Sequence, residues 1–129
     1  MSGKVDKEKF SWKKRLKSFK YAFNGLKILI LEEHNARIHI FIAVCVLIAG
    51  FVFKLSAGEW IVIIWSIGMV VALEAINSAI ENLADFVSPE KHDKIKKIKD
   101  LAAGAVLLGA MVAVIIGLIV FLPKIIAIL

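Results

Sequence analysis

Three long stretches without Lys, Arg, Asp or Glu constrain this chain more than any other feature. They cover residues 38–53, 60–73 and 101–122. About 20 apolar residues of α-helix cross the hydrocarbon core of a bilayer, at 1.5 Å per residue. The third stretch meets this length, the second continues as a helical pattern into polar residues, and Lys54 can extend to the interface at the end of the shorter first stretch. The sequence therefore predicts an all-α integral membrane protein with three transmembrane helices.

The composition agrees with this class of protein. The chain has 129 residues, of which 60% are hydrophobic, which is well above the usual share in a soluble domain. This length allows one domain. Eight Gly and two Pro residues exclude a collagen-like chain, and the single Cys45 excludes an intrachain disulfide.

We expect a single domain over residues 1–129, and its predicted segments follow the hydropathy and charge pattern. They are a flexible tail at 1–9, an amphipathic surface helix at 10–35, spans at 37–55, 59–87 and 100–122, and a basic cytoplasmic loop or helix at 88–99. Ser88 and Pro89 are typical of the N-cap and first position of a helix, so we expect a short basic helix from Pro89. In the third span, Ala105 and Gly109 form a small-residue pair that allows close helix contact.

The positive charges predict the orientation. Residues 1–37 hold ten of the 17 Lys and Arg residues and residues 88–100 hold five, whereas the 54–59 turn and the tail after 122 hold one each. The positive-inside rule then places the N-terminus and the 88–100 segment in the cytoplasm. Because the net charge of +6 is concentrated beside the spans, anionic lipid explains it better than nucleic acid does.

An apolar stripe runs along the predicted N-terminal helix. Its members recur at three- and four-residue steps and fall within an arc of about 80°: Trp12, Leu16, Phe19, Phe23, Leu26 and Ile30. Several lysines lie off the stripe. Such a basic amphipathic helix either lies in the membrane surface or packs its apolar stripe on the spans.

A polar stripe interrupts the second span. Five residues share an arc of about 100° on a helix: Glu74, Asn77, Ser78, Glu81 and Asp85. If Trp60 marks the outer interface, Glu74 lies roughly 21 Å inward and Glu81 roughly 31 Å, at the inner boundary of the hydrocarbon. A charge buried in a span costs about 2.5–3.5 kcal/mol and is a functional candidate by default. A lipid headgroup and a water-soluble reagent could meet along this stripe.

Other charged residues are expected at the same depth. Glu32 and Glu33 end the surface helix, and Lys99 and Asp100 begin the third span. Grouped carboxylates need a cation, and Mg²⁺ prefers a few carboxylates together with phosphates and waters. Lys99 would then contact a phosphate. The alternative is that these groups only pack helices or extend to the interface.

The pattern Glu74-Ala-Ile-Asn77-Ser78-Ala-Ile-Glu81-Asn-Leu-Ala-Asp85, followed by His92 and Lys99-Asp100, resembles the signature of the bacterial diacylglycerol kinase/undecaprenol kinase family. These are small membrane kinases with three spans, and the resemblance covers nearly the whole chain. No zinc-ligand spacing, P-loop or Rossmann glycine pattern is present.

The resemblance implies roles for individual residues. Glu74 would be the general base that takes the proton of the lipid hydroxyl, and Glu33 and Glu81 would hold the Mg²⁺ that bridges the ATP phosphates. The supporting or substrate-contacting residues would be Asn77, Ser78 and Asp85. The residues along ATP would be Lys14, Tyr21, Glu33, Glu81, Glu90, Lys91, His92, Lys99 and Asp100, with Arg15 as the alternative to Lys14.

The implied function is ATP- and Mg²⁺-dependent phosphorylation of a lipid alcohol by a homotrimer with shared sites, in the bacterial inner (cytoplasmic) membrane. Arg37-Ile-His39, Ser88-Pro89-Glu90 and Phe121-Leu-Pro-Lys124 resemble the Gram-positive branch, which favours undecaprenol. Diacylglycerol is the alternative substrate. Two other readings stay open: a proton-coupled transporter with Glu74 as proton carrier, and a subunit that only packs helices.

Overall fold

The computed structural model describes residues 9–129, and these residues fold into four α-helices and no strands. The helices are α1 (Trp12–Glu32), α2 (His34–Val52), α3 (Ala57–Val87) and α4 (Asp93–Ala127). The expected flexible tail at 1–9 lies outside the described residues except for Lys9.

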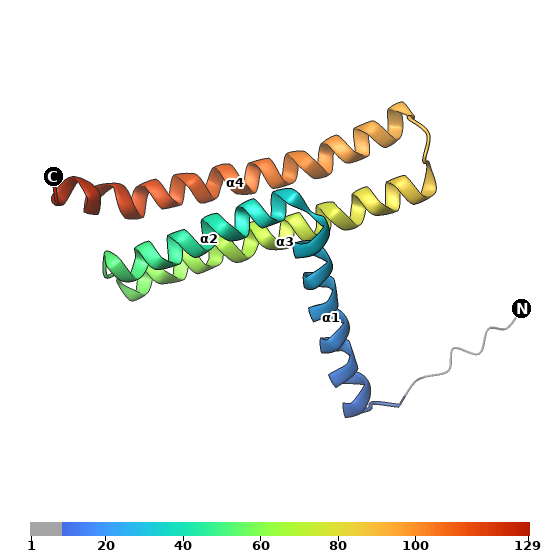
Figure 1. Cartoon of the computed structure of the whole chain (residues 1–129), viewed down its shortest axis with the longest axis horizontal. Coiled ribbons are helices and arrows are strands. Elements are labelled where there is room, and N and C mark those ends of the chain that lie inside the picture. Colours follow the sequence, from blue (N-terminus) through green and yellow to red (C-terminus); the bar gives the residue numbers. More distant parts are fainter. Residues whose placement is uncertain (1–8) are drawn as a thin grey trace, which may run out of the picture.

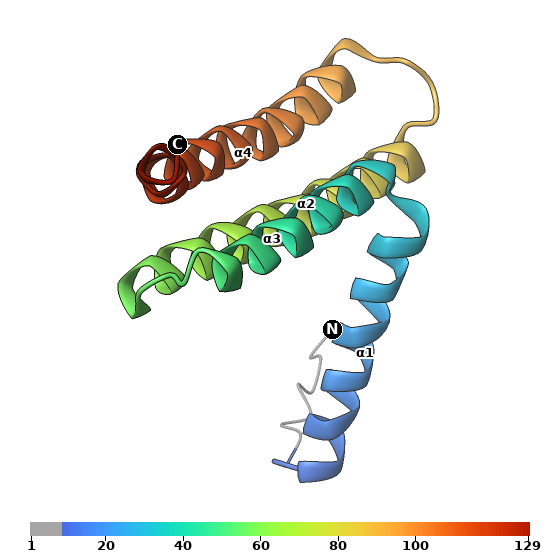
Figure 2. The ribbon, with the colours of Figure 1, turned by 60° about the vertical axis from the view of Figure 1, so that its left-hand side comes forward.

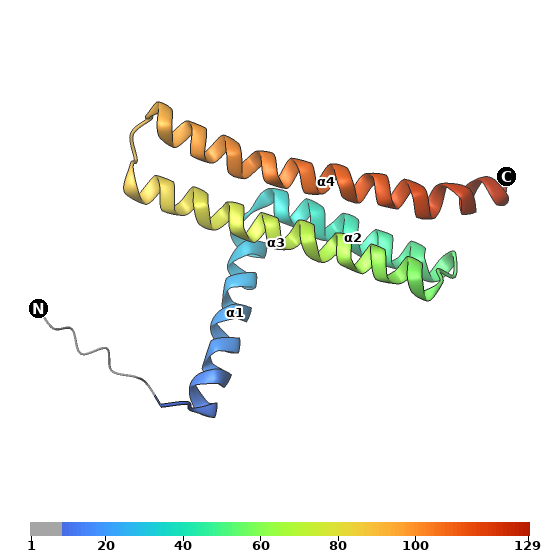
Figure 3. The same ribbon diagram turned by 180° about the vertical axis from the view of Figure 1, so that it is seen from behind.

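Helices α2, α3 and α4 are each long and apolar enough to cross a membrane. They run alongside one another, whereas α1 leaves the bundle at a steep angle (Figures 1 and 3). This arrangement confirms the predicted all-α fold with three candidate spans and a separate N-terminal helix.

The α2–α3 connection closes one end of the bundle, called the turn end below. Lys54 adopts a left-handed backbone conformation there, with φ of 54°. Ser56 then caps α3, because its side chain accepts from the Glu59 backbone N–H while the Glu59 carboxylate accepts from the Ser56 N–H at 3.0 Å. Glu59 also pairs with Lys124 of α4 at 3.1 Å, which ties α3 to α4.

Apolar packing is concentrated at the same end. Leu55, Ile63 and Val120 form a buried cluster, with Trp60 and Phe121 against it. A Cβ added to Gly50 would lie 2.5 Å from the Trp60 ring, so α2 reaches α3 this closely only because residue 50 is glycine.

The start of α4 differs from the prediction. Ser88 is the C-cap of α3 and not the N-cap of a new helix, and its hydroxyl donates to the Glu90 carbonyl. His92 caps α4 instead, since its Nδ1 accepts from the Lys94 N–H, and Asp93 places a negative charge in the first turn. The prediction that this helix begins at Pro89 is therefore wrong, because the helix begins four residues later, at Asp93.

From Asp93 onward α4 is one continuous helix. No break separates the basic segment from the apolar span, and the helix passes Pro123 to end at Ala127. Along it, Ala102 and Gly109 are buried, whereas Ala105 is exposed. The buried small residues are therefore seven positions apart, and a Cβ added to Gly109 would lie 2.6 Å from the Leu73 side chain of α3.

The apolar stripe of α1 does not pack on the spans of its own chain. Trp12 and Phe23 are 75% and 68% exposed, and only Leu29 of this helix is buried. Of the two readings of the stripe, this exposure favours a helix that lies in a membrane surface. The helix ends at Glu32, and the next residue, Glu33, has extended backbone and leads directly into α2.

Candidate active site

The polar stripe of α3 runs from the bundle interior to its solvent-exposed end. Glu74 and Ser78 are buried, at 5% and 8% exposure. Asn77 and Glu81 are half-buried, and Asp85 is exposed. Regular helical geometry therefore places the five polar residues in sequence along one route, from the middle of a candidate span to the α3–α4 loop.

Glu33 meets this stripe from the α1–α2 junction. The Ser78 hydroxyl donates to Glu33 Oε1 at 2.8 Å. This contact joins residues 45 positions apart, and it brings two of the predicted site residues together. The extended backbone at Glu33 turns the chain there, so its carboxylate stands beside α3 at the level of Ser78.

Glu74 has a partner that the sequence analysis did not identify as a site residue. His39 Nδ1 of α2 lies 2.7 Å from Glu74 Oε1. The N–H is not aligned with that oxygen as in a hydrogen bond, so the contact is a close electrostatic one. The available signal was that His39 is a titratable side chain inside an apolar run.

Two oxygen-bearing groups near Glu33 lack partners among residues 9–129. Asn77 Oδ1 is buried without a hydrogen bond. Glu81, one turn further along α3, has no hydrogen bond or ion pair to another described residue. Since buried polar groups are normally paired, the buried Asn77 Oδ1 is suited to a ligand, and the half-buried Glu81 carboxylate is free to bind one as well.

No group of three His, Cys, Asp or Glu side chains able to hold a metal occurs in the described part of the chain. Mg²⁺, however, is commonly bound by one or two carboxylates and completed by substrate phosphates and water. Glu33, Glu81 and the unpaired Asn77 Oδ1 all offer oxygen, the donor atom that Mg²⁺ prefers.

A polar cavity of about 480 Å³ lies at the α3–α4 loop, the loop end of the bundle. Six predicted site residues line it: Asp85, Glu90, Lys91, His92, Lys99 and Asp100. Within it, Lys99 forms an ion pair with Asp85, and Lys96 pairs with Asp100 at 2.5 Å. The structure thus brings the loop residues and the end of the polar stripe into one site with both signs of charge.

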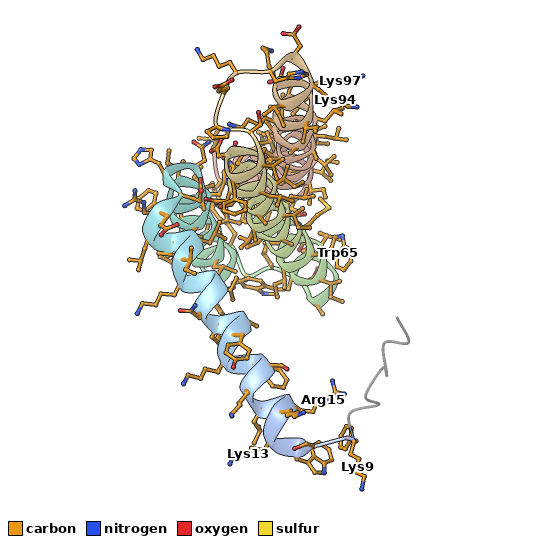
Figure 4. All side chains as sticks on the ribbon, turned by 90° about the vertical axis from the view of Figure 1, so that its right-hand side faces the viewer. Lys9, Lys13, Arg15, Trp65, Lys94 and Lys97 are labelled. Carbon is orange, nitrogen blue, oxygen red and sulfur yellow. The ribbon has the colours of Figure 1, made fainter. Side chains whose placement is uncertain are left out.

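The predicted site residues of α1 lie elsewhere in the chain. Lys14, Arg15 and Tyr21 line a separate surface hollow along α1. Figure 4 shows Arg15 far from Lys94 and Lys97, which stand at the start of α4. Figure 2 likewise shows the first turns of α1 well away from the α3–α4 loop. A single chain does not bring these two groups together.

An apolar cavity of about 260 Å³ continues from His39 into the bundle. Residues of α2, α3 and α4 line it, and apart from His39 the only polar side chain in the lining is Ser66. The Ser66 hydroxyl is already used, because it donates to the Val62 carbonyl at 2.7 Å. The cavity is therefore suited to an aliphatic chain, with its polar end at His39.

Comparison with known proteins relates this architecture to a family. A family model described as prokaryotic diacylglycerol kinase matches residues 20–121. The matched segment holds the larger part of α1, all of α2 and α3, and most of α4. It therefore includes the polar stripe and the loop-end cavity.

Named relatives agree with this match. The undecaprenol kinase of Bacillus subtilis (strain 168) is 43% identical over 108 residues, which cover 84% of this chain and 88% of the relative. A diacylglycerol kinase of Synechocystis is 36% identical over 88% of this chain, which spans 66% of that relative. The diacylglycerol kinase of Escherichia coli (strain K12) is 31% identical over 78% of this chain and 82% of its own.

The resemblance found in the sequence is therefore confirmed. The chain belongs to the prokaryotic diacylglycerol kinase family, and it is a membrane lipid kinase, an enzyme that transfers phosphate to an alcohol.

Proposed function

We propose that this protein phosphorylates undecaprenol to undecaprenyl phosphate, with ATP as phosphate donor and Mg²⁺ as cofactor. The observation that carries the proposal is the route along α3, which leads from the buried Glu74 beside an apolar cavity to the polar cavity at the loop end. In this proposal a lipid alcohol binds in the apolar cavity beside Glu74, and a water-soluble nucleotide binds in the polar cavity at the loop end.

Glu74 is proposed as the general base. Its carboxylate takes the proton of the lipid hydroxyl as the alcohol oxygen bonds to the γ-phosphorus, and the bond from that phosphorus to the oxygen of ADP breaks. Glu74 is suited to this role because it is buried at 5% exposure on the face that carries the other polar residues. A positioned base of this kind contributes about 10²–10⁴-fold to a rate.

Glu33 and Glu81 are proposed to hold Mg²⁺, which neutralises charge on the transferring phosphoryl group when bound. Ser78 orients Glu33 through its hydrogen bond. Asn77 offers its unpaired Oδ1 to the same region. Phosphoryl transfer depends mainly on positioning and charge neutralisation, so such a small set of residues suffices.

The nucleotide is proposed to occupy the loop-end cavity. Lys99 is its phosphate contact, and it exchanges the Asp85 carboxylate for phosphate oxygens on binding. Glu90, Lys91, His92 and Asp100 complete the lining. The remaining predicted residues on α1, Lys14 or Arg15 and Tyr21, lie away from this cavity in the same chain, which favours a site completed by a second copy in a homotrimer.

The loop end is proposed to face the cytoplasm, with the N-terminus on the same side, in the inner membrane of a bacterium. The distribution of Lys and Arg supports this orientation, since residues 1–37 and 88–100 hold 15 of the 17. The exposed apolar stripe of α1 would then lie in the cytoplasmic leaflet.

The proposal of undecaprenol is supported by the 43% identity to an undecaprenol kinase. Diacylglycerol is the second candidate, because relatives at 31–36% identity are named diacylglycerol kinases. The transporter and packing-subunit readings are set aside, because the chain belongs to a kinase family.

Labelled ATP offered with both lipids tests the proposal. The purified protein is incubated in detergent micelles with Mg²⁺, ATP and an equimolar mixture of undecaprenol and diacylglycerol. Labelled undecaprenyl phosphate as the main product is the expected result. Mainly phosphatidic acid would overturn the choice of substrate, and no labelled lipid from either alcohol would overturn the proposed function.

A further inference from the structure

We propose that His39 is a positioning residue for the transfer reaction: it holds one oxygen of the Glu74 carboxylate and leaves the other free for the lipid hydroxyl. The inference rests on the proposed function, in which Glu74 is the base. It assigns a role to a side chain of α2 that is given no role by the family resemblance and lies outside the polar stripe of α3.

The first argument is the geometry of the pair. His39 Nδ1 and Glu74 Oε1 are 2.7 Å apart, and the Glu74 side chain is 6% exposed. No other described side chain forms a hydrogen bond or an ion pair with this carboxylate. A carboxylate inside a span is expensive to bury without a partner, so His39 determines where Glu74 is held.

The second argument is the position of the ring. His39 is the titratable residue in the lining of the apolar cavity between α2, α3 and α4. Its side chain is 26% exposed, so one edge of the ring contacts Glu74 while another part stays open. A lipid chain in this cavity would place its hydroxyl at the polar end, beside the same pair.

The third argument is the chemistry of the two groups. Imidazole can donate from Nδ1 in one neutral tautomer and in the charged form, so its contact does not require protonation. A carboxylate has two oxygens, and a close electrostatic contact at one of them restricts the rotation of the group. The alcohol then meets an oriented base, and reacting groups held in line gain rate without any change in substrate binding.

The test compares three variants of the full-length protein in the micelle assay. His39→Leu removes the electrostatic contact with Glu74, and we expect it to lower kcat by about 10–100-fold with the KM for ATP changed by less than about twofold. His39→Asn places an amide N–H near the position of Nδ1, and we expect it to restore kcat to within about fivefold of the wild type. The matched control is His34→Leu, because His34 is an exposed histidine of the same helix and its loss should leave kcat unchanged.

A double variant separates positioning from general damage to the fold. In Glu74→Asp the carboxylate is withdrawn by one methylene, so His39 no longer holds it in place. Adding His39→Leu to Glu74→Asp should then lower kcat by less than threefold. A full 10–100-fold further loss would show that His39 acts independently of Glu74 and would overturn the proposal.

Two further outcomes also overturn it: unchanged kcat in His39→Leu, or equal losses in the Leu and Asn variants. The failure of this proposal is distinguishable from failure of the proposed function. If the wild type phosphorylates lipid and Glu74→Gln does not, the kinase mechanism stands whatever His39 does.

Discussion

The turn end of the bundle and the polar stripe of α3 differ in how far their polar side chains are paired within the chain. At the turn end, Ser56 and Glu59 cap α3 reciprocally, and Glu59 also pairs with Lys124. In the stripe, Asn77 Oδ1 is buried without a hydrogen bond and Glu81 has no partner among residues 9–129, whereas Asp85 at the end of the stripe pairs with Lys99. The first set closes on itself and stabilises the bundle. The second leaves bonding capacity for a ligand, which supports our proposal that the reaction takes place in the half of α3 that begins at Glu74.

Of the variants considered, Glu74→Gln should cause the largest loss of kcat. It tests whether the polar stripe, and not the turn end, carries out the reaction. Gln keeps the size of the side chain but cannot accept the hydroxyl proton, so we expect kcat to fall by about 10²–10⁴-fold. ATP should still bind with unchanged affinity, which a fluorescent nucleotide analogue can measure. Near-normal turnover in this variant would remove Glu74 from the role of base.

Glu81→Ala tests whether the unpaired groups of the polar stripe bind Mg²⁺. Loss of a carboxylate that holds Mg²⁺ should raise the half-saturating Mg²⁺ concentration at least about tenfold, as measured by titrating activity against the metal. Glu59→Ala is the matched control from the turn end, since Glu59 is already paired within the chain. An identical Mg²⁺ titration for Glu81→Ala and the wild type would contradict ligation at Glu81.

Ser78→Ala removes a single hydrogen bond from the polar stripe, so it should have a smaller effect than the loss of a carboxylate. The hydroxyl of Ser78 holds Glu33, so its loss should weaken Mg²⁺ binding by about threefold to tenfold, the effect of roughly one hydrogen bond. Ser66→Ala is the control, because Ser66 is buried in the same helix but donates only to the Val62 carbonyl. Equal Mg²⁺ dependence in the two variants would show that Ser78 does not act through Glu33.

Glu59→Ala should have the smallest effect on catalysis. It removes the N-terminal cap interaction of α3 and the ion pair with Lys124, so the thermal unfolding midpoint in detergent should fall by a few degrees. The kcat of the folded fraction should equal that of the wild type. A large loss of kcat with an unchanged midpoint would mean that the turn end takes part in the reaction.

The features that were predictable from the sequence are periodic ones. The spans follow from the length of the apolar runs, and the polar stripe follows from 100° of rotation per residue. Both depend only on local spacing, and the structure places Glu74 and Ser78 in the interior as that spacing requires.

The features that could not be predicted are of two kinds. One depends on which of two residues caps a helix, and the other depends on contacts between residues far apart in the sequence. Ser88 and His92 are both adequate N-caps, and their order of preference was decided by the loop, where the Ser88 hydroxyl bonds to Glu90. The contact of His39 with Glu74 joins two helices, and no spacing rule within one helix indicates it. The roles of Glu33, Glu81 and the ATP residues stay predictions.

One consequence follows from the chain reversal at Glu33. This residue is the only non-helical position between α1 and α2, and Trp12 lies 21 residues before it, an arm of roughly 30 Å. A small change in the backbone dihedral angles of Glu33 would displace the far tip of that arm by many ångströms, but it would move the carboxylate at the junction very little. A difference in the angle between α1 and the spans therefore costs the position of the acid beside Ser78 little.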